Sequence, residues 1–359
     1  MFTSLSHLAQ YAPGVDTSLT IEDLKPALRT ARKRIEAIIT PAVYAAIAAL
    51  ATAESSGQSG NSGVSGTSGT SETSGTSESS EYPSTLLSPL RTALANQALS
   101  TQLIFDAVNR RRSGTDIYKY EIEAMRRAYA ENYFSAMDSL IAALEDGVNG
   151  LNGDNGQESP SSPSSPSESS QSESSPYTLW LSTRHHALLA TCRIKSTADF
   201  DAIYPIDLSH LFFFRTIPLQ REALDERIAA YYERAEENEE NGLDGDNGQD
   251  TPSSPSSPLT PSASSLSLLN LALAKRTIAK ALRRFDPLEF PPTIRNLFDE
   301  TNSPGNRANE TMALLSLADR LDQEADSLLE GVDTLLDSSA DVASATAQNL
   351  PTDNIYMMP

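Results

Sequence analysis

The sequence predicts a mainly α-helical protein built from two related helical lobes, and three observations support this fold class. Apolar residues recur at intervals of three and four along several long stretches, which is the spacing of one face of an α-helix. Three tracts rich in Ser, Pro, Gly and Asn separate those stretches, at residues 54–83, 149–176 and 241–265. Helical segments and tracts also follow a similar order in the two halves of the chain.

Composition limits the class of function. The chain has 359 residues, enough for two ordinary domains, and a net charge of −21. Such an acidic chain repels nucleic acid as a whole, so we predict no sequence-specific nucleic-acid binding.

The longest apolar run of the chain, residues 42–53, is shorter than the roughly 20 residues that a bilayer requires. Residues 1–10 lack the features of a secretory signal. We therefore expect the protein to be synthesised in the cytoplasm and to have no membrane span.

The tracts suggest the domain boundaries. We expect an N-terminal lobe at residues 1–148 that contains the tract 54–83, then a disordered linker at 149–176. A C-terminal lobe at 177–340, containing the tract 241–265, and a tail at 341–359 complete the chain. Residues of these types bury too little apolar surface to offset the entropy lost on ordering, so the tracts are predicted to be disordered.

Local signals place the helices of the N-terminal lobe. Thr20 and Asp23 have the spacing of a capping box at the start of a helix, and Pro41 is expected to end or kink that helix. A second, short helix follows at residues 42–53. Helical periodicity resumes over residues 86–112. A long helix, capped by Asp116, is predicted to extend to Asp146.

The C-terminal lobe is less regular at its start. Residues 177–194 contain short apolar runs that fit either strands or helices, and 196–204 resembles a capped helical turn. A helix is expected over 208–237 with an interruption or kink at Pro218. Further helices are predicted at 266–285 and 306–340, joined by a rigid proline-rich turn.

The two halves share an order of elements that suggests duplication. Aligning Pro26 with Pro218 places Arg29 on Arg221, Ala31 on Ala223 and Ala37 on Ala229. Later helices of the two halves share short matches at other offsets, namely Leu94-Ala95 with Leu273-Ala274, Leu103 with Leu282, and Asp138-Ser-Leu140 with Asp326-Ser-Leu328. Residues 149–166 and 241–258 are also nearly identical, although they occupy different places in the two halves. The repeated tract fits linker sequence inserted into exposed loops, which tolerate such insertions.

Residue types used in catalysis are present but are not arranged in a known pattern. His185 and His186 are adjacent, so they do not share a helix face, and neither has an acidic or cysteine partner at metal-ligand spacing. Cys192, the single cysteine, lies in an apolar run typical of the core. Residues 244–248 resemble a calcium loop but lack its later ligands. We predict no enzyme activity, cofactor or metal, unless Trp180 and the two histidines line a concave pocket with perturbed pKa values.

Charged residues suggest where partners would bind. Basic residues gather on the first long helix, at the end of the second and on the helix 266–285, whereas the last helix carries an acidic stripe that recurs every three or four residues. These clusters are interpreted either as solvated faces paired with neighbouring residues or as surfaces that meet a partner of opposite charge; the acidic stripe could also line a channel for DNA. The candidate interaction residues are Arg29, Arg32, Lys33, Arg110, Arg111, Arg112, Asp322, Asp326, Glu330, Asp333 and Asp337.

Several segments resemble a family of phage and prophage structural proteins. They are residues 19–47, beginning Leu-Thr-Ile-Glu-Asp-Leu, together with 94–99, 118–125, 180–182 and 196–204. The first of them is also similar to the small helical connectors that form rings beneath a phage portal. The resemblance implies an oligomeric adaptor without catalytic residues. The chain departs from those connectors in its greater length, its apparent doubling and its Ser-rich insertions, so no ring stoichiometry follows.

We therefore expect a structural adaptor of a phage or prophage particle, a head–tail connector that acts by helix packing. Its expected partners are portal, tail or neighbouring connector subunits, with further copies of itself in a homo-oligomer. It would reside in the virion, and in the host cytoplasm during assembly. The alternative is a bacterial scaffolding or interaction protein in which the tracts act as flexible spacers.

Overall fold

The protein is helical throughout the part of the chain that the computed structural model describes, which comprises residues 1–15, 19–57, 82–112, 118–153, 175–243, 261–298 and 307–347. No β-strand occurs within those ranges, which confirms the predicted mainly α class. The elements are α1 (Leu5–Leu8), α2 (Ile21–Ile39), α3 (Pro41–Gly57), α4 (Tyr82–Arg112), α5 (Lys119–Gly153), α6 (Pro176–Leu181), α7 (Arg184–Leu189), α8 (Thr197–Ile203), α9 (His210–Ala223), the π-helical turn η4 (Leu224–Ile228), α10 (Ala229–Leu243), α11 (Pro261–Arg284), the 3₁₀ turn η5 (Pro287–Glu289), α12 (Pro292–Arg295) and α13 (Arg307–Ala347).

The chain divides into two compact units. Unit 1 comprises residues 1–187 together with Ser209–Phe214, and unit 2 comprises Leu188–Leu208 together with Arg215–Pro359. The division therefore falls within α9, whose first residues belong to unit 1. Each unit is built around a pair of long helices in contact, α4 with α5 in unit 1 and α11 with α13 in unit 2. The duplication inferred from the sequence stays a prediction.

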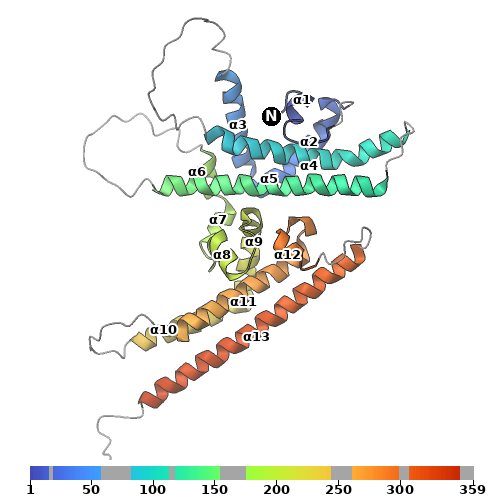
Figure 1. Cartoon of the computed structure of the whole chain (residues 1–359). Helices are drawn as coiled ribbons and strands as arrows, with labels where there is room; N and C mark the ends of the chain where they lie inside the picture. The colour runs from blue at the N-terminus through green and yellow to red at the C-terminus, as the bar shows by residue number, and fades with distance from the viewer. Residues whose placement is uncertain are drawn as a thin grey trace, which may run out of the picture. The chain divides into compact units, whose positions relative to one another are not determined.

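Unit 1 begins with the predicted capping box. The backbone N–H of Thr20 donates to Asp23 Oδ2 over 3.0 Å, and the N–H of Asp23 donates to Thr20 Oγ1 over 3.3 Å. As expected, α2 ends before Pro41, the residue at which α3 starts. Helix α2 packs on α4, and α4 and α5 run side by side as a hairpin (Figure 1).

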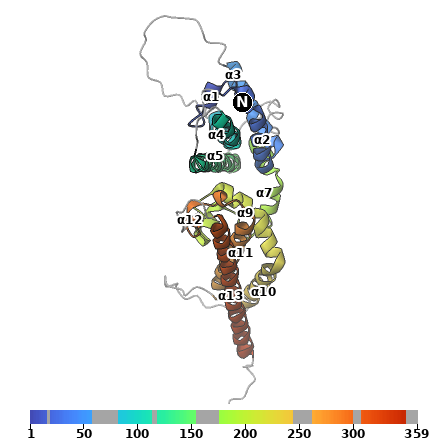
Figure 2. The ribbon, with the colours of Figure 1, turned by 90° about the vertical axis from the view of Figure 1, so that its right-hand side faces the viewer.

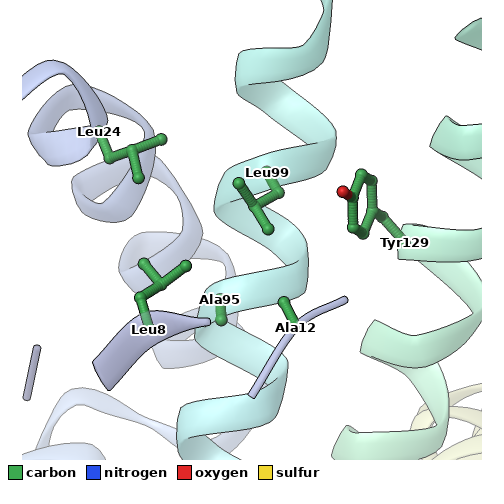
Figure 3. Close-up of a cluster of buried hydrophobic side chains, with 6 residues drawn as sticks. All are labelled: Leu8, Ala12, Leu24, Ala95, Leu99 and Tyr129. Carbon is green, nitrogen blue, oxygen red and sulfur yellow. The ribbon is translucent and has the colours of Figure 1, made fainter. Parts of the chain in front are cut away.

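The N-terminal segment closes the core of unit 1. Leu8 and Ala12 lie against α2 and α4, and the ring of Tyr129 on α5 lies across from them (Figure 3). The Tyr129 hydroxyl donates to the carbonyl of Pro13 over 3.0 Å, which satisfies its polar atom. Its burial raises the pKa of the phenol. Side chains far apart in sequence thus hold the first turns of the chain on the helical hairpin.

Unit 2 is organised by the antiparallel pair α11 and α13, which lie side by side (Figure 1 and Figure 2). The buried stripe of α13 repeats every eleven residues, because the same spacing of four, three and four runs from position 314 to 325 and again to 336. An eleven-residue period corresponds to about 3.67 residues per turn, close to a straight helix. The stripe consists of Leu314, Ala318, Leu321, Ala325, Leu329, Val332 and Leu336. The leucines that recur along this helix in the sequence are Leu314, Leu317, Leu321, Leu328 and Leu335; Leu314 and Leu321 are buried, whereas the other three are partly exposed.

The interruption expected at Pro218 lies further along the chain. Helix α9 continues through Pro218 to Ala223, and the five residues Leu224–Ile228 then form a π-helical turn before α10 begins. A π-turn inserts one extra residue into the helical repeat. Proline lacks one backbone donor but did not end the helix here, so the predicted position of the break was wrong.

Several predicted boundaries also move. The undecided segment at 177–194 forms the short helices α6 and α7, and the predicted cap of 196–204 is confirmed, since Ser196 Oγ accepts from the Asp199 N–H over 3.0 Å. Helices α3, α5 and α10 continue three to five residues into the predicted tracts, and α11 starts before its expected residue. A helix end needs only backbone hydrogen bonds to propagate, so it can outlast the apolar pattern. The cap predicted at Asp116 and the remainder of the three tracts lie outside the described residues.

Candidate interaction surfaces

The most distinctive surface of unit 1 lies where α4 ends and α5 begins. Six large apolar side chains at this end of the hairpin are between 41 % and 61 % exposed. We call this set the hairpin-end surface; its members are Ile104, Phe105 and Val108 of α4 with Tyr118, Tyr120 and Met125 at the start of α5. The rings of Tyr118 and Tyr120 stack with centroids 5.5 Å apart. Within unit 1, this end of the hairpin extends past α1 and α2 (Figure 1).

Sequence reasoning missed the hairpin-end surface. The apolar positions at helical spacing in this segment of the sequence are Leu90, Leu94, Leu99, Leu103 and Ala107, and all of them except Leu103 are buried. Phe105 lies outside that stripe, because successive helical residues are rotated by about 100°. The sequence did contain a signal for this surface, because apolar residues occur on more than one face of this helix. The predicted interaction residues Arg110, Arg111 and Arg112 are the last three residues of α4, and their side chains lie outside the described set.

The basic residues of α2 are divided between two environments. The Nε of Arg32 donates to Glu36 over 2.6 Å, and its guanidinium lies 4.9 Å from the ring centroid of Tyr44. Arg29 and Lys33 are exposed and have no ion-pair partner among the described residues. Within the described part of the chain, Arg29 and Lys33 therefore remain unpaired at the surface of this helix, whereas Arg32 pairs within its own unit.

The acidic stripe of α13 meets arginines of unit 2. Asp326 accepts from Arg276 on α11 and, over 3.1 Å, from Arg227 of η4. Asp322 accepts from Arg283 over 2.6 Å. Asp333 and Asp337 both accept from Arg234 on α10, over 2.7 and 3.4 Å. Glu330 is exposed, and its side chain has no partner among the described residues. Most of the stripe thus joins α13 to its own unit.

The opposite side of α11 is paired in the same way. Lys280 donates to Glu222 and Glu226 over 3.0 and 2.6 Å, and Arg284 donates to Glu222 over 2.6 Å. Hydrogen bonds from Arg284 and Lys280 lower the pKa of the Glu222 carboxyl to about 2. Helix α11 is therefore a basic helix between carboxylates of α9 and η4 on one side and of α13 on the other. The sequence interpretation of its cations as paired with neighbouring acids is confirmed.

The histidine pair packs among aromatic rings in unit 1. Trp180 is fully buried and stacks on Phe214 at 4.5 Å, and His185 stacks on the same ring at 4.3 Å. His186 meets the Trp180 ring edge-on at 5.4 Å, and burial lowers the pKa of its imidazole. These contacts use the imidazoles as flat packing surfaces.

The remaining reactive group is also enclosed. Cys192 is buried in unit 2, and desolvation raises the pKa of its thiol to about 11, so it is protonated at neutral pH. Across the described ranges no three His, Cys, Asp or Glu residues gather as a metal site would need. A groove of about 560 Å³ lies between the N-terminal segment, α4 and α5; it is lined mainly by hydroxyl and amide side chains such as Thr92, Asn96 and Asn132.

Among the described residues no single helix is both long enough and apolar enough to span a bilayer. Helix α2 and the first part of α3 meet both conditions together, as a pair bent by 118°.

Comparisons with known proteins found no relative of this chain. No known protein family matches the chain, and neither the curated proteins nor the solved structures contain a match. The fold and surfaces thus define the class of protein as a two-unit helical protein with an exposed aromatic hairpin end.

Proposed function

We propose that this chain is a structural adaptor that binds another protein through its hairpin-end surface. The observation that carries the proposal is the exposure of six large apolar side chains near the end of α4 and the start of α5, where the rings of Tyr118 and Tyr120 stack. Monomeric proteins rarely expose such side chains together, and clusters of them commonly mark a binding site. Tyr, Phe and Met are also among the residues enriched in protein interfaces.

The arrangement of the hairpin suits a docking role. Helices hold their side chains in fixed positions, so little conformational entropy is lost when a partner covers them. Phe105 and Tyr120 are 60 % and 61 % exposed, and each would bury a large ring on binding. Burial of such a side chain stabilises a complex by about 1.5–3 kcal/mol.

A phage or prophage particle is the setting that we propose for this adaptor, with a portal or tail protein as partner. The resemblance of the opening helix to portal-associated connectors supports that setting. Arg126 is exposed on α5, so a fitting partner would offer an apolar groove with an acidic residue at its rim. The proposed role is non-catalytic, and the chain would reside in the virion.

The test measures the mass of the purified protein by light scattering, alone and with a candidate portal protein. The informative variant is Phe105→Ser with Tyr120→Ser, which removes two exposed rings from the hairpin-end surface. A matched control is Leu297→Ser with Met312→Ser, because these residues of unit 2 are also exposed, at 50 % and 70 %. Circular dichroism melts check that both variants fold.

Capture of the wild type and of the control by the portal, with at least tenfold weaker capture of the hairpin variant, would support the proposal. Equal binding of all three proteins would show that the hairpin-end surface is not the binding site. A wild type that stays monomeric and ignores portal and tail proteins would contradict the connector role. Specific capture of a host protein through the same surface would instead favour the scaffolding alternative.

A further inference from the structure

Residues 209–214 occupy a distinctive place in the chain. They form the start of α9 and belong to unit 1, whereas the residues on both sides of them belong to unit 2. Phe212, Phe213 and Phe214 are almost fully buried, and Phe214 lies between the rings of Trp180 and His185. We call residues 209–214 the aromatic plug; Phe214 packs it against unit 1.

Two carboxylates of α5 hold the start of the plug. Asp138 Oδ1 accepts from the Ser209 hydroxyl and from the Leu211 N–H, both over 2.8 Å. It thus caps α9 from another helix, a role usually filled by a neighbour in sequence. Two turns further along α5, Glu145 Oε2 lies 2.8 Å from Nδ1 of His210, and both side chains are less than one third exposed.

The chain just before the plug is strained. Asp207 and Leu208 have φ angles of 55° and 52°, in the left-handed region that L-residues with a Cβ rarely adopt. Hydrogen bonds hold this turn, since Asp201 Oδ1 accepts from the N–H groups of Ile206 and Leu208 over 2.8 and 3.1 Å. Strained backbone persists only where surrounding contacts determine it, and such turns are common at elements that switch.

We propose that residues 209–214 form a latch whose attachment to α5 depends on protonation of His210. The protonated imidazole makes a charge-assisted hydrogen bond to Glu145. The neutral ring can still donate a hydrogen bond to the carboxylate, but the attraction between opposite charges is lost. Because the adjoining turn is strained, loss of the charged contact favours release of the first turn of α9 from α5. This inference is independent of the proposed adaptor function.

The direction of the pH dependence follows from the groups around His210. The hydrogen bond to Glu145 raises the pKa of the His210 imidazole; burial lowers it, and the charges of Asp138 and Asp146 raise it further. A raised pKa stabilises the folded state fully below the unfolded value of 6.5, and this contribution is lost as the pH rises through the folded value.

His186 is the nearby group with the opposite dependence. Burial lowers the pKa of its imidazole, so its protonation below pH 6.5 opposes folding, although the charge of Glu145 partly offsets this. His185 also contacts the plug, through Phe214. The interval from pH 6.5 to 8.5 therefore isolates the effect of His210 from that of His186.

Hydrogen exchange with mass spectrometry tests the latch in the full-length protein. The protection of the amides at 211–214 is compared at pH 6.5 and 8.5, after correction for intrinsic exchange. The variants are His210→Gln, which keeps a hydrogen-bonding side chain but cannot titrate, and the control His7→Gln, which alters another histidine of unit 1. A second measurement follows the ring proton of His210 by NMR in the wild type and in Glu145→Gln.

The proposal predicts that protection falls by about fivefold from pH 6.5 to 8.5 in the wild type and in His7→Gln, and stays constant in His210→Gln. The His210 pKa should exceed 6.5 in the wild type and fall in Glu145→Gln. Protection that does not change with pH, or that falls equally in His210→Gln, would overturn the latch. Should His210→Gln fail to fold, a wild-type pKa at or below 6.5 would overturn it independently.

Discussion

Gly147 on α5 lies where a methyl group has no room. A Cβ built on this residue would lie 2.1 Å from Cε1 of Tyr177, the residue that follows Pro176 at the start of α6. Three residues along the same helix, a Cβ on Gly150 would meet nothing within 4 Å. The two glycines share a helix but differ in their neighbours, so a comparison of Gly147→Ala with Gly150→Ala separates packing from helix propensity.

The expected magnitudes follow from two opposing effects. Alanine is favoured over glycine inside a helix by about 1 kcal/mol, and this gain applies at both positions. At Gly147 the alanine also displaces the ring of Tyr177, which costs about 2 kcal/mol if most of its buried contact is lost. We therefore expect Gly147→Ala to destabilise the protein by about 1 kcal/mol, and Gly150→Ala to stabilise it by somewhat less than 1 kcal/mol near the helix end.

Urea unfolding followed by circular dichroism measures both changes, and a double-mutant cycle identifies the cause. In a Tyr177→Ala background the obstruction is gone, so Gly147→Ala should then stabilise the protein by about 1 kcal/mol. A change of sign between the two backgrounds is the result expected. If Gly147→Ala stabilises the wild type, or destabilises it equally with and without the Tyr177 ring, the close approach of α6 to this glycine is refuted.

Two further predictions concern the ion pairs of α11. Asp326→Ala removes the shared acceptor of Arg276 and Arg227 and should cost about 1–2 kcal/mol in urea unfolding, because the Arg276 side chain is 15 % exposed. The control Glu330→Ala should change stability by less than about 0.5 kcal/mol, and equal effects would argue against the pairing. Because the pKa of Glu222 is lowered to about 2, its ionised carboxylate stabilises the fold above pH 4.5, and this stabilisation is lost as the pH falls toward 2. The melting temperature of Glu222→Gln should therefore fall less over that interval than the melting temperature of the wild type. Identical decreases would count against this role of Glu222.

The candidate surfaces were only partly accessible from the sequence. The acidic stripe of α13 was predicted, since a spacing of three and four places carboxylates on one face of a helix. The residues that the stripe meets were not, because Arg227 and Arg234 precede it by about a hundred positions and no local rule links them. The hairpin-end surface was missed for a related reason: its apolar residues look like core residues until the packing shows which of them are covered.

Local signals determined much of the secondary structure. The Thr20–Asp23 capping box, the end of α2 before Pro41 and the cap at Ser196 each depend on groups within a few residues, so sequence spacing was sufficient. The helical class also followed, because the periodicity of apolar residues records which face of each long helix is buried.

Tertiary structure alone decided which partners those faces have. Ala318 and Ala325 lie in the buried stripe of α13, while the larger Leu317 and Leu328 are partly exposed, because position on the helix and not side-chain size decides contact with α11. Asp138 caps α9 and Glu145 meets His210 across 65 or more residues of chain. Such pairings depend on how the chain returns to itself in space. The sequence therefore determined most of the helices, and the packing of each unit determined which of their faces are buried and which charges, rings and apolar surfaces remain available to a partner.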